Sequence, residues 1–304
     1  MDNLTLGRLR VSAVVERAGP TRPTWLLPDA TPEALERHRE WLAPHFLDDR
    51  GRLLQSIHAF VVRAPGLTAL VDTCVGNDKD RGGQAPFHMM RTNFLEDLRA
   101  VGVPPESVDL VICTHLHVDH VGWNTRLDNG RWVPTFPRAR HLFARTEWEH
   151  WASERDHNTR RIMADSVQPV LDAGLATLVE VDHRVSDELW LEPTPGHTPG
   201  HVSVRLSSGD GEAVITGDLM HHPVQVAEPG WGSHGRCWLR GRSHRMGRSK
   251  RKSGASYEDS ASARARSSFA PSPRHALPCI HASVAGLVEA NLSSMSRAFL
   301  VCEK

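Results

Sequence analysis

The segment from Val108 to His120 places an apolar run directly before four potential metal ligands. Its first residues, VDLVIC, indicate a buried strand. His115 and His117 follow two residues apart, so both imidazoles can face one point, while Asp119 and the last histidine can face a second point nearby. Imidazole nitrogen and carboxylate oxygen suit Zn²⁺, and a catalytic zinc takes about three protein ligands and leaves a position for water. The segment therefore predicts a metal centre at the end of a strand.

Two further motifs place ligands next to predicted strands. The run TPGHTPGH, residues 194–201, sets a histidine in a turn braced by Gly and Pro, and TGD, residues 216–218, sets a carboxylate at a strand end, where it can bridge two metals. Any one of the 19 histidines is more often a surface or core residue than a ligand, but three ordered motifs beside strands are hard to reach by coincidence. The expected site consists of His115, His117, Asp119, His120, His197 and Asp218.

In this order and spacing, HxHxDH, PGHTPGH and TGD resemble the motifs of the metallo-β-lactamase superfamily, over roughly residues 8–234. The resemblance implies an α/β (α+β) fold, a four-layer αββα sandwich with the metals at the edge between its two halves. The ligands it implies are, for the first metal, His115, His117 and His197, for the second, Asp119 and His120, and, bridging both, Asp218.

The resemblance also implies the function of a metal-dependent hydrolase with Zn²⁺, one or two ions, although other divalent metals suit such ligands too. The metal lowers the pKa of bound water to roughly 7 and polarises the scissile carbonyl or phosphoryl oxygen. Asp119 is the expected catalytic residue, which orients the nucleophile and passes a proton to the leaving group. Residues 23–25, 120–124 and 136–139 resemble a branch with lactonases and organophosphate hydrolases, so the expected substrate is a small ester, lactone or phosphoester.

Apolar patterning predicts two mixed α and β halves. The first half has a helix at residues 93–101 and strands at residues 9–15, 57–62, 67–71 and 108–113. The second half has helices near residues 147–153 and 160–173, and strands at residues 140–143, 177–181, 188–192, 201–206 and 212–216.

Three histidines beside the motifs have less certain roles. His201 is expected to begin a strand or to support His197 without binding metal itself. His221 and His222 follow TGD and either line the pocket or are structural.

Several other residues close to the motifs have expected roles. Of the large apolar residues that can shape a pocket, we favour Trp123, because it lies three residues past His120. Asp72, in the run LVDT, resembles an early strand-end motif of the family and is expected to be structural. Cys74 and Cys113 are expected to be inert core residues.

The chain changes character at residue 236. Residues 1–235 carry 23 Lys and Arg against 32 Asp and Glu, whereas residues 236–304 carry 13 against 4. Residues 236–274 are rich in Arg, Ser, Ala and Gly and have no sustained apolar period, which is typical of disorder. We expect a metallo-β-lactamase-like hydrolase domain at 1–235 and a basic, atypical tail at 236–304, either disordered or translated out of frame from a G+C-rich gene.

The family's last histidine ligand, which belongs late in the second half, is not recognisable. His275 and His281 are available, but neither follows a recognisable buried strand, and His244 lies within the Arg/Ser-rich run. If the tail is out of frame, the second half of the fold is incomplete at its C-terminus. The second metal then keeps only Asp119, His120 and Asp218 as ligands. The sequence therefore predicts weak binding of a second metal and low activity.

Two alternatives from other classes stay open. One is a nuclease-like protein that meets nucleic acid through the basic tail, but the tail has few aromatic residues for stacking and the main domain is acidic. The other is a catalytically impaired relic of the fold. We expect a small-molecule substrate and no nucleic-acid partner, while the oligomeric state is not indicated.

Composition indicates a compartment. Five widely spaced cysteines without a CxxC pair argue against a disulfide framework. No signal-peptide pattern begins the sequence and no stretch has the apolar length of a membrane span. The expected location is therefore the cytoplasm, without membrane contact.

Overall fold

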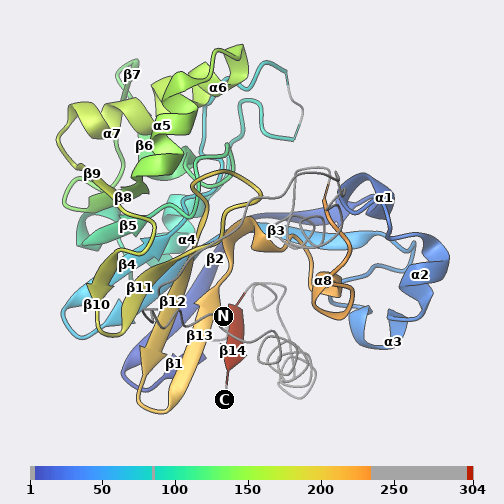
Figure 1. Ribbon diagram of the computed structural model, residues 1–304. Helices are drawn as coiled ribbons and strands as arrows, with labels where there is room; N and C mark the ends of the chain where they lie inside the picture. Colours follow the sequence, from blue (N-terminus) through green and yellow to red (C-terminus); the bar gives the residue numbers. More distant parts are fainter. Residues whose placement is uncertain (1–3, 84–85, 234–299, 304) are drawn as a thin grey trace, which may run out of the picture.

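The computed structural model describes residues 4–83, 86–233 and 300–303. Two sheets pack against each other, and a long two-stranded ribbon runs from them to a group of short helices (Figure 1). The mixed α/β sandwich that the sequence predicts is confirmed.

The first sheet has seven strands in the order β1-β2-β3-β4-β5-β8-β9. Their bounds are β1 Leu4–Leu6, β2 Leu9–Thr21, β3 Leu53–Ala64, β4 Leu67–Val71, β5 Leu110–Ile112, β8 Arg140–Ala144 and β9 Ala176–Val179. The strands from β1 to β4 pair antiparallel, and those from β4 to β9 pair parallel. The parallel strands end at one edge of the sheet, so the loops after β4 and β5 meet there.

The second sheet has five antiparallel strands in the order β10-β11-β12-β13-β14. Their bounds are β10 Arg184–Ser186, β11 Leu189–Pro193, β12 Val202–Ser208, β13 Gly211–Ile215 and β14 Leu300–Glu303. A separate hairpin joins β6 Thr125–Asp128 to β7 Arg131–Pro134.

The end of the expected tail is a strand that the sequence pattern did not predict. β14 pairs with β13, which extends the second sheet by one strand. Residues 236–299, the expected boundary at residue 235 and the histidines considered there lie outside the described residues. The basic-tail prediction for them therefore stays a prediction.

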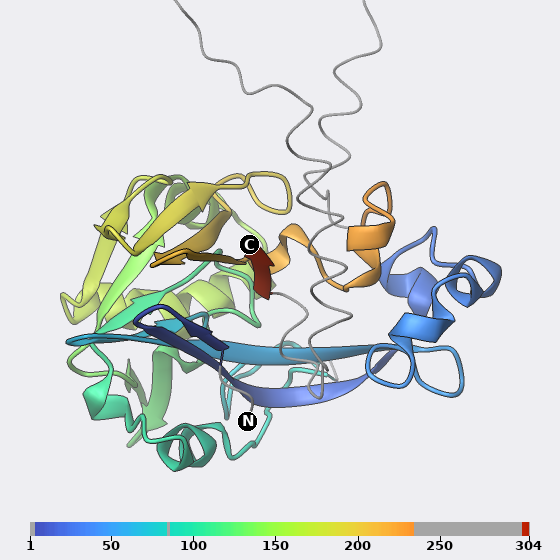
Figure 2. The ribbon, with the colours of Figure 1, turned by 90° about the horizontal axis from the view of Figure 1, so that it is seen from below.

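Helices cover the outer face of the first sheet (Figure 2). These are α4 Phe94–Ala100, α5 Arg145–Ser153, α6 His157–Ile162, a π-helical turn Met163–Val167 and α7 Gln168–Asp172. They agree with the helices predicted at 93–101, 147–153 and 160–173. None of the helices in the described part of the chain has the length and apolar composition needed to cross a bilayer.

The apolar core lies mainly between the two sheets. Alternate residues of β12, including Val204, point inward and pack with Val62 and Ile112 of the first sheet. A second cluster lies between the first sheet and its helices, and Phe94 of α4 is completely buried there. Each such side chain contributes about 1.5–3 kcal/mol when it leaves water. The alternation of apolar residues in the sequence predicts both clusters.

Three of the four expected layers are present in residues 4–83, 86–233 and 300–303. They are the helices α4 to α7, the first sheet and the second sheet. In the second sheet, Trp190 of β11 and Arg205 of β12 alternate with the inward residues and are partly exposed.

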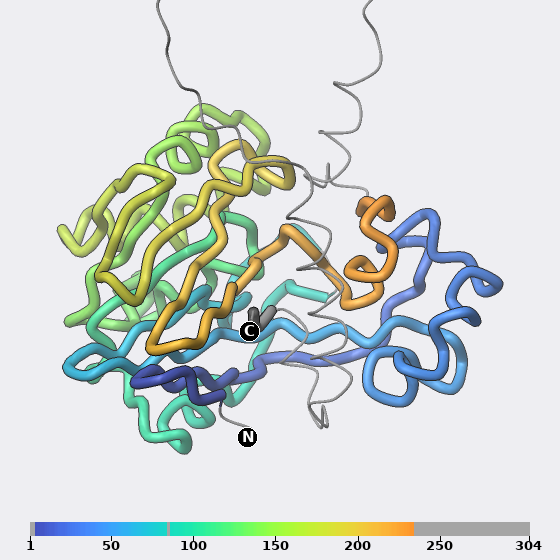
Figure 3. Tube along the Cα trace, turned by 60° about the horizontal axis from the view of Figure 1, so that its bottom comes forward, coloured from blue at the N-terminus to red at the C-terminus, as the bar shows by residue number. Residues whose placement is uncertain are grey.

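A third apolar cluster joins the segment between β2 and β3 to the segment after β13. It combines α1 Pro23–Leu26, α2 Pro32–Glu36, α3 Arg39–Leu42 and α8 Val224–Ala227. β2 and β3 pair along their whole length and extend beyond the sandwich to reach this group. Figure 3 shows α8 beside the three early helices. Segments about 190 residues apart thus form one wall next to the first sheet.

A buried charged network ties the loop after β4 to the π-helical turn. Arg81 donates from Nη1 to Asp165 Oδ2 (2.6 Å) and from Nη2 to Oδ1 (3.0 Å). Lys79 donates to Thr125 Oγ1 (2.8 Å) and to the Asp165 carbonyl (3.1 Å), and its Nζ lies 3.8 Å from the ring centre of Trp132. Burial lowers the pKa of Lys79 to about 7, although Asp165 opposes that shift.

Lys79 is therefore expected to make stability depend on pH. Its pKa is lower in the folded chain than the ordinary 10.5, so the unfolded chain binds more protons between about pH 7 and that value. Stability then rises with pH across this window, by an amount on the order of a few kcal/mol. Lys79→Met should flatten the rise in urea unfolding measured between pH 6.5 and 9.5. An unchanged pH dependence in the variant would contradict the assignment.

Candidate metal centre

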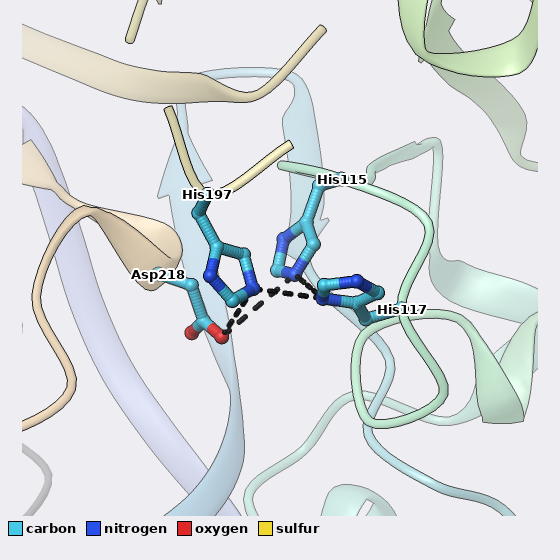
Figure 4. A group of neighbouring side chains, drawn as sticks. All are labelled: His115, His117, His197 and Asp218. Carbon is cyan, nitrogen blue, oxygen red and sulfur yellow. Dashed lines mark hydrogen bonds and ion pairs between the residues drawn. The ribbon is translucent and has the colours of Figure 1, made fainter. Parts of the chain in front are cut away.

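The sequence-predicted ligands lie in three loops at one edge of the sandwich. His115 and His117 follow β5 of the first sheet. His197 lies in the loop between β11 and β12, and Asp218 follows β13, both in the second sheet. Figure 4 shows these four side chains pointing toward one another.

The four side chains converge closely. His117 Nδ1 lies 2.9 Å from His115 Nε2 and 2.8 Å from His197 Nε2. Asp218 Oδ2 lies 3.2 Å from His197 Nε2 and 3.8 Å from His115 Nε2. All four ligand atoms are within 4.8 Å of one another. One imidazole nitrogen has a single proton or lone pair and cannot satisfy two others at once, so the arrangement fits a shared cation.

Two other expected ligands, Asp119 and His120, lie next to this group. His120 Nε2 lies 3.3 Å from Asp218 Oδ1 and 3.8 Å from Asp119 Oδ1. Asp218 thus faces the first group with one oxygen and His120 with the other. The structure brings all six sequence-predicted residues around one centre, and the side chain of Asp119 is 28% exposed.

Asp72 holds the HxHxDH loop, as the sequence predicts. Its Oδ1 accepts from the backbone N–H of Thr114 (2.8 Å), and its Oδ2 lies 2.8 Å from His120 Nδ1. A carboxylate on one ring nitrogen fixes the ring so that the other nitrogen faces the centre. Asp72 therefore orients His120.

His201 supports Asp218 rather than His197. Its Nε2 accepts from the backbone N–H of Asp218 (3.0 Å), and its Nδ1 lies 2.8 Å from Thr194 Oγ1. Gly217 makes this close packing possible. It has a φ of +53°, and an added Cβ would lie 2.8 Å from Thr114 Oγ1 and 2.9 Å from His201 Nε2. The glycine of TGD is thus required by conformation and by space.

The ionisation states favour a cation at the centre. Burial lowers the pKa of His117 and of His197 to about 4, and that of His115 well below its ordinary value. Neutral imidazole is the form that binds metal. Burial opposes ionisation of Asp218, yet the neighbouring His120 and His221 hold its pKa well below the usual range. Burial also opposes a charge on His120, but Asp218 and other carboxylates raise its pKa.

An open pocket of about 730 Å³ adjoins the centre. His117, Asp119 and Asp218 lie on one side of it. Its apolar wall comes from the ribbon and its neighbours, namely Trp25, Leu26, Ile57, Phe60 and Phe87. Trp25 is 59% exposed, which is unusual for so large an apolar side chain.

Trp123 is not part of this wall, so the prediction for it was wrong. Its side chain is 4% exposed, stacks on Phe94 with ring centres 5.7 Å apart, and donates to Glu16 Oε1 (2.6 Å). The 3₁₀ turn Gly122–Asn124 directs the indole into the core. Nearness to His120 in sequence does not place a residue in the pocket.

Of the two histidines after TGD, only one belongs to the site. His221 Nε2 lies 3.3 Å from Asp218 Oδ2, and its ring centre is 5.0 Å from that of His197. His222 points away and bonds through Nε2 to the Phe46 carbonyl (3.0 Å).

Sequence reasoning missed two residues near the centre. His58 of β3 lines the pocket, and the alternation along that strand was the signal available for it. Glu147 contacts both ligand loops from α5, and nothing in its local sequence indicates this.

The family model described as the metallo-beta-lactamase superfamily matches residues 53–267. N-acyl homoserine lactonase of Bacillus thuringiensis is 29% identical over 118 residues, which cover 39% of this chain and 40% of the relative. N-acyl homoserine lactonase AttM of Agrobacterium fabrum is 29% identical over 139 residues, which cover 42% and 44%. The chain thus spans less than half the length of the curated relatives it matches.

Solved structures show the same fold. The hydrolase AbOPH in the beta lactamase superfamily superposes with a TM-score of 0.62 and 23% identity, over 80% of this chain and 84% of that one. AidC, a dizinc quorum-quenching lactonase, superposes with a TM-score of 0.61 and 19% identity, over 81% and 85%. The family model matches most of the chain, and the chain therefore belongs to the metallo-β-lactamase superfamily.

Proposed function

We propose that the chain is a metal-dependent hydrolase that uses Zn²⁺ to cleave a small ester, lactone or phosphoester. The observation that carries the proposal is the convergence of three neutral imidazoles and one carboxylate beside an open pocket. When bound, the metal supplies Lewis-acid polarisation and lowers the pKa of water. Membership of a metallo-hydrolase superfamily supports the same reaction class.

The residues of the chain have distinct roles in this proposal. His115, His117 and His197 would hold the first ion and Asp119 and His120 the second, and Asp218 offers one oxygen toward each group. Asp119 is the proposed catalytic residue, because its partly exposed carboxylate lines the pocket, where it can take a proton and deliver it to a leaving group.

The pocket favours a substrate with an apolar arm. Its wall includes Trp25, Phe60 and Phe87, while the polar groups gather at the ligand loops. The relatives that match over part of their length are named as lactonases of N-acyl homoserine lactones. We therefore place a lactone or ester first, with its acyl arm along the apolar wall.

The alternative partner, nucleic acid, depends on the basic tail, and no observation in the described part of the chain favours it. The impaired-relic alternative predicts a folded protein without turnover, so the assay below separates it from the proposal. The cytoplasm remains the predicted location.

Activity is expected to depend on the first ligand group. The full-length protein should hydrolyse at least one substrate in a panel of N-acyl homoserine lactones, aryl esters and phosphotriesters. His117→Ala should lower kcat/KM by more than about 100-fold, because it removes a direct ligand. His222→Gln is the matched control, since this histidine bonds to the Phe46 carbonyl outside the centre. Equal activity of the wild type and His117→Ala would contradict the proposal.

The two metal positions are expected to differ in affinity. In the first, His117 lies within hydrogen-bond distance of both His115 and His197, whereas the second has the wider contacts of His120, and the family's last histidine is not recognisable in the sequence. Titration of the metal-free protein with Zn²⁺ against a chromophoric chelator should give one tight and one weaker equivalent. Elemental analysis that finds two tightly held ions in the purified protein would contradict this expectation.

Trp25 is expected to act on substrate binding alone. It is exposed in the pocket wall and lies on α1, outside the ligand loops, so Trp25→Ala should raise KM for long acyl chains several-fold, at about 0.8 kcal/mol per methylene left in water. The kcat and the metal content should stay unchanged. If KM does not depend on acyl length in the wild type or in Trp25→Ala, the acyl arm of the substrate does not lie along Trp25.

A further inference from the structure

Glu147 is a buried carboxylate whose partners lie in both ligand loops. It stands in the first turn of α5 and is 1% exposed. Its Oε1 accepts from the backbone N–H of Leu116 (3.1 Å) and from Trp151 Nε1 (2.6 Å). Its Oε2 accepts from the backbone N–H of Gly200 (2.9 Å).

The two backbone donors lie close to the histidine ligands in the sequence. Leu116 lies between His115 and His117, in the loop after the first sheet's β5. Gly200 lies three residues after His197, in a loop of the second sheet. One carboxylate thus bonds to the loops that carry all three histidines of the first group. The bond from Val202 N to the Thr114 carbonyl (3.0 Å) joins the same loops nearer the core.

The loop at Gly200 and the start of α5 are in close contact. An added Cβ at Gly200 would lie 2.2 Å from the backbone nitrogen of Glu147, so the loop sits directly on the start of α5. This accounts for the second glycine of PGHTPGH by space alone. Close packing of this kind transmits small displacements to neighbouring groups.

Only a carboxylate satisfies all three donors. It accepts on both oxygens and donates nothing, whereas the amide of a glutamine would direct an N–H at one of the donors. All three bonds are buried or nearly so, and a buried donor left without a partner costs about 1–3 kcal/mol. In the described ranges 4–83, 86–233 and 300–303, no cation forms an ion pair with Glu147, so its contacts are all with neutral N–H groups.

We propose that Glu147 is a positioning residue that sets the distance between the His115–His117 loop and the His197 loop. The affinity of the first metal position then depends on this carboxylate, although it touches neither metal nor substrate. The role rests on the metal centre of the proposed function, because it acts through the histidines of that centre.

The test is Zn²⁺ affinity of the full-length protein, measured by competition with a chromophoric chelator, together with the absorption spectrum of the Co²⁺-loaded protein. Glu147→Ala should weaken the first equivalent by about tenfold or more, as loss of a group outside the ligand set commonly does. It should also change the Co²⁺ bands. The Zn²⁺ affinity of Glu147→Gln should lie between those of Glu147→Ala and the wild type, because the glutamine keeps two of the three hydrogen bonds.

Two control variants separate positioning from general destabilisation. Trp151→Phe removes the bond within α5, leaves both loop bonds and keeps an aromatic ring against His117 (ring centres 5.1 Å apart), so its Zn²⁺ affinity should stay close to that of the wild type. Asp165→Asn disturbs a buried network that includes none of the ligand loops, so it should lower Tm without a change in affinity.

Each result decides the matter. Wild-type affinity and Co²⁺ bands in both Glu147 variants overturn the positioning role, and so does an equal loss of affinity in Asp165→Asn. If Glu147→Ala does not fold, Glu147→Gln against Trp151→Phe gives the answer. A wild type that binds no Zn²⁺ refutes the metal centre itself, whereas a wild type that binds and hydrolyses beside unaffected Glu147 variants refutes only the role of Glu147.

Discussion

The ligands of the metal centre come from two different sheets, so the apolar core between those sheets sets every distance in the site. Ile112 and Ile215 are completely buried or nearly so, and each lies three residues before a proposed ligand. The backbone therefore leaves a close-packed interior immediately before His115 and Asp218. Because such interiors have few alternative packings, the strand ends hold the loops to a narrow range of positions. The loops need only local devices, such as Gly217 and Asp72, to aim the side chains.

Charge at the centre is arranged around Asp218. A buried carboxylate is costly unless it is paired, and here its two oxygens face different histidines. The imidazoles of His117 and His197 stay neutral because burial dominates, whereas His120 is shifted in the other direction by its carboxylate neighbours. Such contrast within one cluster is typical of a functional site. It follows from the fold, because Asp218, Asp72 and Asp119 all act on His120, whereas burial outweighs the carboxylates at the other two.

Much of this organisation could be predicted from the sequence. β5 is an unbroken apolar run, β4 and residues 57–62 of β3 are mostly apolar, and the positions of the ligand motifs after strands can be read from the sequence. The long ends of β2 and β3 could not be predicted, since alternation stops where the ribbon leaves the sandwich. Trp123 and Glu147 show a second limit. Trp123 was expected in the pocket and lies in the core, whereas no role was predicted for Glu147, which bonds to both ligand loops. Each role depends on contacts between segments far apart in the chain.

The reaction class and the choice of substrate depend on different parts of the structure. The proposed reaction depends on motifs that follow buried strands, and such strands tolerate little variation in direction. Much of the pocket wall instead comes from Trp25 and Leu26 of α1 and from the ends of β2 and β3, outside the core between the sheets. Trp25 and Leu26 can change without altering the strands that precede the ligands, because both lie on α1. Membership of the superfamily therefore constrains the chemistry of this chain much more tightly than the molecule on which that chemistry acts.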